Sequence, residues 1–532
     1  MARGQAELSA RVEAPVTIKA YLLCVFAAFG GILFGYDSGY ISGVLGMNYF
    51  KREFGHPGST DTDNAYEGYL YHTWEKSLIT SILSAGTFFG ALFAGSLADW
   101  IGRRTTVVAG CVVFAVGVVL QVASTAVNLL VAGRLIAGIG VGFVSATIIL
   151  YMSEIAPKAV RGAIVSGYQF AITIGLLLAS CVDQATKNRM DSGSYRIPIS
   201  IQFAWAIILG GGLLCLPESP RYFVKDDKLE KAASALARIR GQPADSEYIQ
   251  SELAELVANF RHEREHMQSG WIDCFRGGWS PSGNLRRVML GVFLQMFQQL
   301  TGVNFIFYYG TTFFQQVGLK NAFIISVITN VVNVCSTPLS FWAIERLGRR
   351  PLLIFGAIGM LVCEFIVAIV GVAAPDSNAQ GICLIVFVCI YIFFFATTWG
   401  PAAWVVIGEV YPLPIRAKGV ALSTASNWLW NFVLGYVTPY MVDANEGNLG
   451  VKVFFVWGST CTLCALFAFF MVPETKGLSL EQVDRMLEET TPATSAKWVP
   501  HETFADEATR KDIAKATGAT TVYDESVEPK SA

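Results

Sequence analysis

Charged side chains are scarce in this chain of 532 residues. Asp, Glu, Lys and Arg make up 15% of it, whereas a soluble globular domain carries about 25%. Neither sign is in excess, because 39 basic residues face 41 acidic ones and the formal net charge is −2. This balance argues against nucleic acid as a partner, since nucleic-acid-binding chains concentrate basic residues.

Several other signatures are missing. There is no Asn-x-Ser/Thr sequence, so we expect no N-linked glycan. The segment from Arg3 to Lys19 is polar and no small-residue cleavage pattern follows it, so we expect no cleaved signal peptide. No nucleophile–base–acid set or metal cluster is apparent, which predicts a chain that is not an enzyme and uses no metal or other cofactor. Cys461 and Cys464 form a C-x-x-C pair inside an apolar run, where packing is the better explanation.

Long apolar runs dominate the sequence instead. Hydrophobic residues make up 53% of the chain, and its mean hydropathy is +0.46. They gather in blocks of about 20 residues, which is the length that crosses a bilayer as a helix. The predicted spans are twelve, at about 20–46, 77–98, 105–124, 127–151, 163–183, 197–216, 288–315, 322–345, 351–374, 381–411, 419–442 and 452–472. Gly86 with Gly90 and Gly138 with Gly142 lie inside two spans, and we expect them to allow close helix packing.

Three charged clusters occur twice in the same order. They are the Gly-Arg-Arg strings at 102–104 and 348–350, the acidic strings ending in proline at 154–157 and 409–412, and the Pro-Glu-Ser/Thr strings at 217–219 and 473–475. The copies lie 246 to 256 residues apart, and each cluster follows an apolar run. A duplicated set of membrane helices with charged ends is typical of a transporter built from repeats.

A polar and basic stretch separates the two copies. Its Lys and Arg residues place it in the cytosol by the positive-inside rule, and both termini with it. We therefore predict an all-α integral membrane fold with twelve transmembrane helices in two six-helix halves. The expected parts are a cytosolic N-terminal segment (1–19), the N-terminal half (20–216), a cytosolic helical linker (217–287), the C-terminal half (288–472) and a cytosolic tail, mostly disordered (473–532).

The seventh span carries an unusual density of amide side chains. One helical face is shared by Gln295, Gln298, Gln299 and Gly302. Buried amides are costly unless they form hydrogen bonds, and an amide offers the donor and the acceptor that a sugar hydroxyl needs. We interpret the cluster as a site for a polyhydroxyl ligand, with hydrogen bonding between helices as the alternative. Gly302 can unwind the helix so that Asn304 turns into the same cavity.

Polar and aromatic residues in other spans fit the same ligand. Single amides occur at Gln169, Asn333 and Asn427. Aromatic rings that can stack on the apolar face of a sugar occur at Tyr308, Tyr309, Phe395, Trp404 and Trp428. Any one of these rings is also explained by packing or by an interfacial aromatic belt.

Asp37 places a carboxylate inside the first span. An ionisable group in a span is costly and is functional by default. Helix 1 runs outward and helix 4 inward, so Asp37 and Arg134 fall in the outer halves of their helices and can pair. A carboxylate whose pairing changes with conformation can carry a proton, so we interpret the two as a proton-coupling site. The alternative is a static ion pair.

The duplicated charges are predicted to close the cytosolic side. They lie at cytosolic helix ends, and positive-inside topology does not explain why acidic residues repeat among them. We interpret them as ion pairs that break when an inner gate opens. The set is Asp99, Arg103, Glu154, Arg161, Glu218 and Arg221 in the first half and Glu345, Arg349, Glu409, Arg416 and Glu474 in the second.

These strings closely resemble the sugar porter family of the major facilitator superfamily over about residues 18–490. The matching motifs are the doubled Gly-Arg-Arg, Pro-Glu-Ser-Pro-Arg, Gln-Gln-Leu-Thr-Gly-Val-Asn and Pro-Glu-Thr-Lys-Gly, and the stretch 191–198 resembles fungal hexose transporters. The resemblance implies sugar contacts at Gln169, Gln298, Gln299, Asn304, Asn333, Trp404 and Asn427, with Phe34, Tyr308 and Trp428 nearby. It also implies that Asp37 with Arg134 couples sugar to protons in the symporting members.

The resemblance leads us to expect a hexose transporter, with glucose/proton symport by alternating access in a fungal plasma membrane. The partners are then a monosaccharide, a proton and the lipid bilayer, and the chain is expected to be monomeric. A facilitative hexose or pentose uniporter is the alternative within the class, because yeast facilitators also carry Asp at the position of Asp37. A sugar sensor that does not transport is the alternative from another class.

Overall fold

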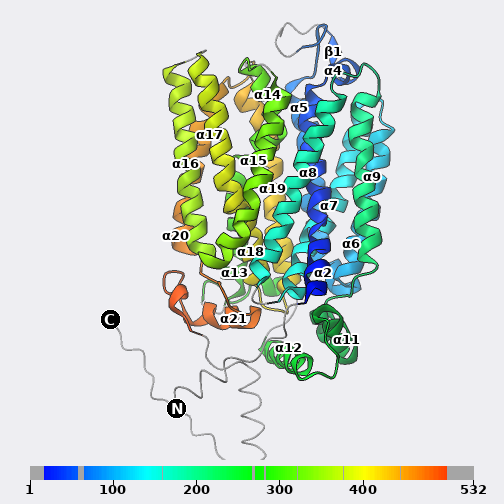
Figure 1. The fold of residues 1–532 in the computed structure, drawn as a ribbon, viewed down its shortest axis with the longest axis vertical. Coiled ribbons are helices and arrows are strands. Elements are labelled where there is room, and N and C mark those ends of the chain that lie inside the picture. Colours follow the sequence, from blue (N-terminus) through cyan, green and yellow to red (C-terminus); the bar gives the residue numbers. More distant parts are fainter. Residues whose placement is uncertain are drawn as a thin grey trace, which may run out of the picture.

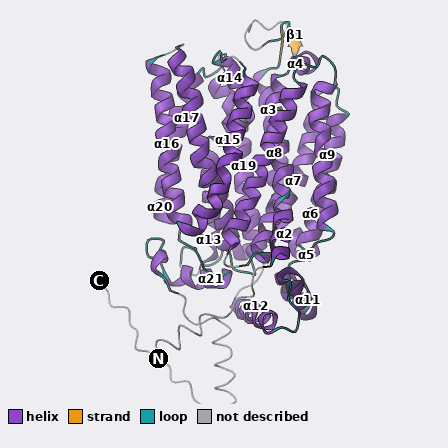
Figure 2. Cartoon of the chain, in the orientation of Figure 1, coloured by secondary structure: helices purple, strands orange, loops and turns teal. Residues whose placement is uncertain are grey.

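The computed structural model describes residues 17–57, 65–157, 160–266, 270–280, 283–319, 321–374, 377–443 and 445–499. It is a bundle of long helices that run side by side (Figure 1), and strand is confined to a two-stranded hairpin at one end (Figure 2). The all-α membrane fold predicted from the apolar runs is therefore confirmed. The predicted N-terminal segment lies almost wholly, and the predicted tail beyond residue 499 entirely, outside the described residues.

The helices fall into two groups along the sequence. The N-terminal helices are α2 (Ile18–Ala28), α3 (Gly30–Gly46), α5 (Thr73–Ile101), α6 (Arg103–Val122), α7 (Val127–Ile155), α8 (Arg161–Thr186) and α9 (Gly193–Leu213). The C-terminal helices are α13 (Asn284–Leu300), α14 (Val303–Gln316), α15 (Ala322–Arg346), α16 (Arg349–Ala373), α17 (Asn378–Thr397), α18 (Trp399–Glu409), α19 (Arg416–Val442) and α20 (Val453–Met471). The division into two independent halves stays a prediction.

Three predicted spans are broken within the bundle. The first is divided at Phe29 into α2 and α3, the seventh at Gly302 into α13 and α14, and the tenth at Thr398 into α17 and α18. Gly302 has φ of +82°, a left-handed conformation that glycine adopts without steric cost. A break in a spanning helix frees backbone groups for other partners.

Eleven segments are long and apolar enough to cross a membrane by length and composition. The remaining predicted span, 419–442, corresponds to α19, a helix of 27 residues that does not meet the same hydropathy criterion. Its polar residues include Asn427 and Asn431, which are buried against the neighbouring helices α5 and α13. α19 is therefore a bundle helix whose polar groups face protein.

Close contacts between helices occur where the glycine pairs were predicted to allow them. A Cβ on Gly86 would collide with the backbone of Leu135 in α7, and a Cβ on Gly138 would collide with the backbone of Leu83 in α5. The prediction that these glycines serve packing is confirmed.

The bundle has two different ends (Figure 1). At one end lie α4 (Asn48–Phe54) and the hairpin of β1 (His56–Pro57) and β2 (Tyr69–Leu70), and we call this end the hairpin face. At the other end lie α10 (Pro220–Lys225), α11 (Leu229–Arg240), α12 (Glu247–His266) and α21 (Leu480–Glu489), and we call it the linker face. The short 3-10 helices are η2 (Ile272–Phe275), η3 (Gly450–Lys452) and η4 (Ser495–Lys497).

Candidate functional site

The amides of α13 meet α18 and α19 in the interior of the bundle. The Gln298 side chain donates to the carbonyl oxygens of Trp399 (3.1 Å) and Gly400 (3.0 Å). Asn427 Nδ2 lies 2.7 Å from both Gln295 Oε1 and Gln298 Oε1. All three amide side chains are buried. Gln298 therefore ties α13 to the first residues of α18, just after the break at Thr398.

A second layer of polar groups follows on α14. Asn304 Nδ2 donates to Gln299 Oε1, and so does Asn431 Nδ2. Asn431 also donates to the Tyr308 hydroxyl (3.0 Å) and accepts a hydrogen bond from Ser84 of α5 (2.7 Å). Asn304 reaches Gln299 because the left-handed Gly302 re-aims the chain between α13 and α14. This layer spans the two helix groups, because α5 is N-terminal and α19 is C-terminal.

Aromatic rings line both sides of these amides. The rings of Phe34 and Trp428 meet edge to face with centroids 4.8 Å apart, and Trp428 Nε1 donates to Ser145 of α7 at 3.3 Å. Trp404 meets Tyr168 of α8 edge to face at 5.7 Å. Each of these contacts joins an N-terminal helix to a C-terminal helix. Of the predicted aromatic residues, Phe34, Trp404 and Trp428 therefore lie at the boundary between the two groups.

The remaining predicted amides occupy the same boundary from other helices. Gln169 of α8 lies against α18, since a Cβ on Gly400 would be 3.2 Å from its Nε2. Asn333 of α15 is fully buried, and neither of its side-chain polar atoms has a hydrogen-bond partner among the described residues. An unpaired buried amide is costly, so Asn333 is ready to bond a polar ligand.

Sequence reasoning missed some members of this cluster. Asn431 follows Asn427 by one helical turn on α19 and shares its face. That spacing was a signal in the sequence. Ser84 and Ser145 carried no signal, because isolated serines are common in membrane helices.

Asp37 and Arg134 are both buried but do not form the hydrogen-bonded pair that the sequence suggested. Among the described residues, neither Asp37 carboxylate oxygen has a hydrogen-bond partner. Arg134 Nη1 instead lies 2.5 Å from the Tyr40 hydroxyl, which donates to Gln121 Oε1 at 2.7 Å. Tyr40 lies one helical turn beyond Asp37 on α3, and its hydroxyl contacts the Arg134 guanidinium. The positive charge of Arg134 therefore acts on Asp37 electrostatically, without a hydrogen bond between them.

Two further carboxylates are buried within spans and were not singled out in the sequence. Asp183 of α8 lies against Gly43 of α3, and its Oδ1 has no hydrogen-bond partner among the described residues. It lines a small polar cavity with Ser180, Thr311 and Asn330, between the two helix groups. Glu364 of α16 is buried near Cys461. Asp183 lies at the end of the predicted span 163–183, where a charged residue is common and does not by itself indicate a functional site.

The repeated charges form the same arrangement twice. In the N-terminal copy, Arg103 makes a two-pronged contact with Glu154 (3.1 and 3.0 Å) and a longer one with Asp99 (3.6 Å). Glu218 accepts the backbone N–H groups of Arg103 and Arg104 at 3.0 and 3.1 Å, and Ser219 donates to Glu154. Burial raises the pKa of the Glu218 carboxyl, against the opposite pull of these N–H groups.

The C-terminal copy repeats these contacts atom for atom. Arg349 contacts Glu409 at 3.2 and 2.9 Å and Glu345 at 3.7 Å. Glu474 accepts the backbone N–H groups of Arg349 and Arg350, and Thr475 donates to Glu409. The paired glycines, Gly102 and Gly348, have φ of +92° and +91°. Within each copy, the repeated arginine is thus brought together with its predicted carboxylates.

Other contacts join the two helix groups at the linker face. Lys418 of α19 lies 2.9 Å from Asp99 of α5, and Lys225 of α10 lies 3.0 Å from the same carboxylate. The Ala163 N–H of α8 donates to Glu345 of α15 at 3.0 Å. Lys418 carried no repeat signal, so sequence reasoning missed it.

The three remaining predicted gate arginines are also buried at the linker face. Arg221 donates to the Glu154 carbonyl and Arg416 to the Tyr411 carbonyl. Arg161 starts α8. Each of the three therefore lies beside, but outside, the two repeated carboxylate–guanidinium pairs.

The hairpin face is joined across the groups as well. Lys76 of α5 contacts Asp443, which follows α19, at 3.1 Å. Gln316 donates to the same carboxylate at 2.9 Å, and Ser42 of α3 donates to Thr311 of α14 at 3.3 Å. Both ends of the bundle therefore hold the two groups together.

Comparisons with known proteins agree with this geometry. The family model described as sugar (and other) transporter matches residues 23–487. The chain is 49% identical over 496 residues to the major facilitator-type transporter ecdD of Aspergillus rugulosus, covering 90% of each. It is 45% identical to the probable glucose transporter rco-3 of Neurospora crassa, covering 88% of this chain and 79% of that one.

A solved structure shares the fold. The proton:xylose symporter XylE bound to 6-bromo-6-deoxy-D-glucose superposes with a TM-score of 0.77 at 28% identity, covering 88% of this chain and 99% of that one. The inward open conformation of XylE from E. coli gives a TM-score of 0.65. The chain therefore belongs to the sugar transporter family of the major facilitator superfamily, and it is a multi-pass membrane transporter and not an enzyme.

Proposed function

We propose that this protein takes up a hexose such as glucose by symport with protons through alternating access. The observation that carries the proposal is the amide cluster of Gln298, Asn427, Gln299 and Asn431, which lies where the N-terminal and C-terminal helices meet. A sugar hydroxyl both donates and accepts hydrogen bonds, so the amides can bond to the sugar in place of one another. The rings of Trp404 and Trp428 beside the amides suit the apolar face of a pyranose.

Asp37 is the proposed proton carrier. Its carboxylate is buried and unpartnered among the described residues, and its charge acts on the Tyr308 hydroxyl of the second amide layer. A proton on Asp37 removes that charge, which changes the field at a group that contacts the sugar site. Arg134, held by Tyr40, then acts as a fixed positive charge that stabilises the ionised form from a distance. XylE, which has a similar structure, is described as a proton:xylose symporter, and this similarity supports the assignment.

The cycle needs each face to open in turn. Opening the linker face would separate Asp99 from Lys418 and Glu345 from Ala163, whereas the repeated pairs within each copy would move as units. Opening the hairpin face would separate Lys76 from Asp443. In the proposed orientation the linker face and both termini are cytosolic, the membrane is the plasma membrane and the protein acts as a monomer.

The decisive experiment is uptake of radiolabelled sugars in a cell that lacks its own hexose transporters. We expect glucose to accumulate above its external concentration, an uncoupler to abolish the accumulation, and unlabelled hexoses to compete. Equilibration that ignores the proton gradient would reject symport and leave a facilitator. Failure of every hexose to compete would reject the substrate class.

A sugar sensor is the second candidate. The chain is 40% identical to the high glucose sensor RGT2 of Saccharomyces cerevisiae, covering 90% of this chain and 62% of that protein. A sensor would bind glucose with the same amides and transmit the change through the linker face. In the same cells, a glucose-dependent transcriptional response without measurable flux would favour this candidate over transport.

A further inference from the structure

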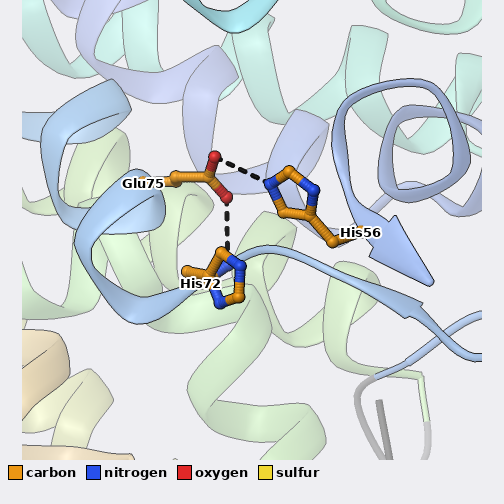
Figure 3. Close-up of side chains that lie close together, drawn as sticks. All are labelled: His56, His72 and Glu75. Atoms are coloured by element: carbon orange, nitrogen blue, oxygen red, sulfur yellow. Dashed lines mark hydrogen bonds and ion pairs between the residues drawn. The ribbon is translucent and has the colours of Figure 1, made fainter. Parts of the chain in front are cut away.

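Two histidines and a glutamate gather at the hairpin face, away from the proposed sugar and proton sites. His56 belongs to β1, and His72 and Glu75 stand at the start of α5. Figure 3 shows the His56 ring against the Glu75 carboxylate with His72 beside it, and the two imidazole rings stack with centroids 4.7 Å apart. Glu75 Oε1 lies 2.9 Å from His56 Nε2, and Glu75 Oε2 accepts the backbone N–H of His72 at 3.1 Å. Sequence spacing alone does not indicate a metal site here, because 16 positions separate the first histidine from the second.

The donor atoms of these residues already lie almost within one coordination shell. One ligand atom from each of the three residues can be chosen so that all lie within 4.8 Å of one another. Zinc binds imidazole nitrogen and carboxylate oxygen at about 2.0–2.2 Å, which separates neighbouring ligands by roughly 3.3 Å in a tetrahedron. Rotation of the imidazoles covers the difference, and the His56 side chain is 51% exposed and therefore free to turn. Glu75 is buried and gives the site a fixed carboxylate.

We propose that His56, His72 and Glu75 form a binding site for a zinc-class divalent transition ion, with water as the fourth ligand. Two imidazoles and one carboxylate select such an ion over Mg²⁺ or Ca²⁺, which prefer shells of oxygen alone. The exposed rings give the ion a path from solvent.

The bound ion would hold the transporter closed at this face. It would fasten the β1–β2 hairpin to the first turn of α5, and the next residue of that turn is Lys76, which contacts Asp443 beyond α19. Gln316 of α14 bonds the same carboxylate. The ion would therefore stiffen the segment that carries Lys76, on the N-terminal side of the contact that must break when the hairpin face opens. Zinc is expected to slow transport without entering the sugar site.

Binding is tested directly on the purified full chain in detergent, by titration calorimetry with ZnCl2. We expect one high-affinity site per chain, and a loss of about tenfold or more in affinity for His56→Ala and for His72→Ala, since even outer ligand partners contribute tenfold or more. Glu75→Gln should weaken zinc similarly while it keeps the helix cap, because Gln also serves at this capping position. His262→Ala on α12, at the opposite end of the bundle, is the matched control and should bind like the parent.

The proposed site would be overturned if the parent bound zinc no more tightly than the double variant His56→Ala with His72→Ala. Because this measurement uses no sugar, its failure would leave the proposed hexose transport untouched. The clamp is tested by uptake in intact cells: external ZnCl2 should lower the initial rate in the parent and in His262→Ala, but not in His72→Ala. Equal inhibition of the parent and His72→Ala, or none in a parent that binds zinc, would overturn the clamp.

Discussion

At the scale of single residues, Asn427 is the point on which the first amide layer depends. Its one amide group donates to the side-chain oxygens of both Gln295 and Gln298. Gln298 in turn donates to two carbonyls of α18, so Asn427 helps to orient side chains that join three helices. A residue in this position influences the shape of the site as well as any contact with the ligand.

Replacing Asn427 should therefore weaken sugar binding. Asn427→Ala leaves two buried amide oxygens without donors, at about 1–3 kcal/mol, which corresponds to a rise in KM on the order of 10- to 100-fold. Initial-rate uptake at varied glucose concentration gives the KM, and surface abundance normalises the rate. Asn188→Ala, an exposed asparagine after α8, should behave like the parent. An unchanged KM in Asn427→Ala would remove this amide from the site.

Replacing Asp37 separates coupling from transport. Asp37→Asn has nearly the same shape but holds no proton in the relevant pH range, so we expect it to abolish accumulation against a gradient. Exchange of labelled for unlabelled sugar across the membrane needs no net proton movement and should persist. The measurement is uptake with and without an uncoupler beside counterflow in the same vesicles. Accumulation by Asp37→Asn at the parent's level would show that another group carries the proton.

Some residues of the candidate site could be predicted from the sequence and others could not. The amides of α13 could be found because buried amides in an apolar span are costly unless they form hydrogen bonds. Lys418 and Ser84 could not, because their partners lie more than 300 residues away in the sequence. The sequence led us to expect that Asp37 pairs with Arg134, but in the structure the Arg134 guanidinium contacts the Tyr40 hydroxyl instead.

At the scale of elements, the breaks in the spans matter more than their ends. Apolar length predicted where helices cross, since hydrocarbon thickness fixes that length. It predicted α17 and α18 as one span, because the break at Thr398 depends on tertiary contacts such as the hydrogen bond from Trp399 Nε1 to the Leu353 carbonyl. The break at Gly302 was signalled by glycine itself.

Gly302 offers a test of the broken seventh span. Its left-handed backbone and the Trp457 ring, which would lie 2.6 Å from an added Cβ, both oppose a side chain. Gly302→Ala should lose about 1–2 kcal/mol from the backbone alone, and more from the clash. Thermal unfolding in detergent measures the loss. Gly318→Ala is the matched control, because its φ is +78° but no atom lies within 4 Å of the added Cβ. Equal losses in the two variants would show that the ring contact contributes nothing.

At the scale of the whole molecule, the charges at the linker face serve two purposes. The two repeated clusters are internal to their helix groups and brace each one. Asp99 differs from its counterpart Glu345, because Lys418 and Lys225 both reach it from outside the group. The pairs within each repeated cluster thus stabilise their own helix group, whereas the contact of Asp99 with Lys418 joins the two groups and must break when the linker face opens.

The two purposes can be separated by mutation. Arg349→Ala leaves Glu409 buried without its cation, which should cost about 3–5 kcal/mol of folding free energy and reduce the amount of folded protein. Lys418→Met leaves Asp99 with Arg103 and Lys225, so it should fold normally but favour the state open at the linker face. Cysteine accessibility near Lys418 reports that state. The double variant Asp99→Lys with Lys418→Asp exchanges the two charges and should partly restore the state closed at the linker face. If closure is not restored, Asp99 and Lys418 do not form a direct gate contact.

α19 has a further consequence, which concerns how the protein is made. It is the predicted span that falls short of the hydropathy of the other eleven, and polar residues within a span oppose its release into lipid. The partners of its asparagines, in α5 and α13, precede it in the chain and are synthesised first. α19 can therefore enter the membrane against a bundle that is already partly assembled. The residues proposed to bind sugar also set the order in which the helices come together.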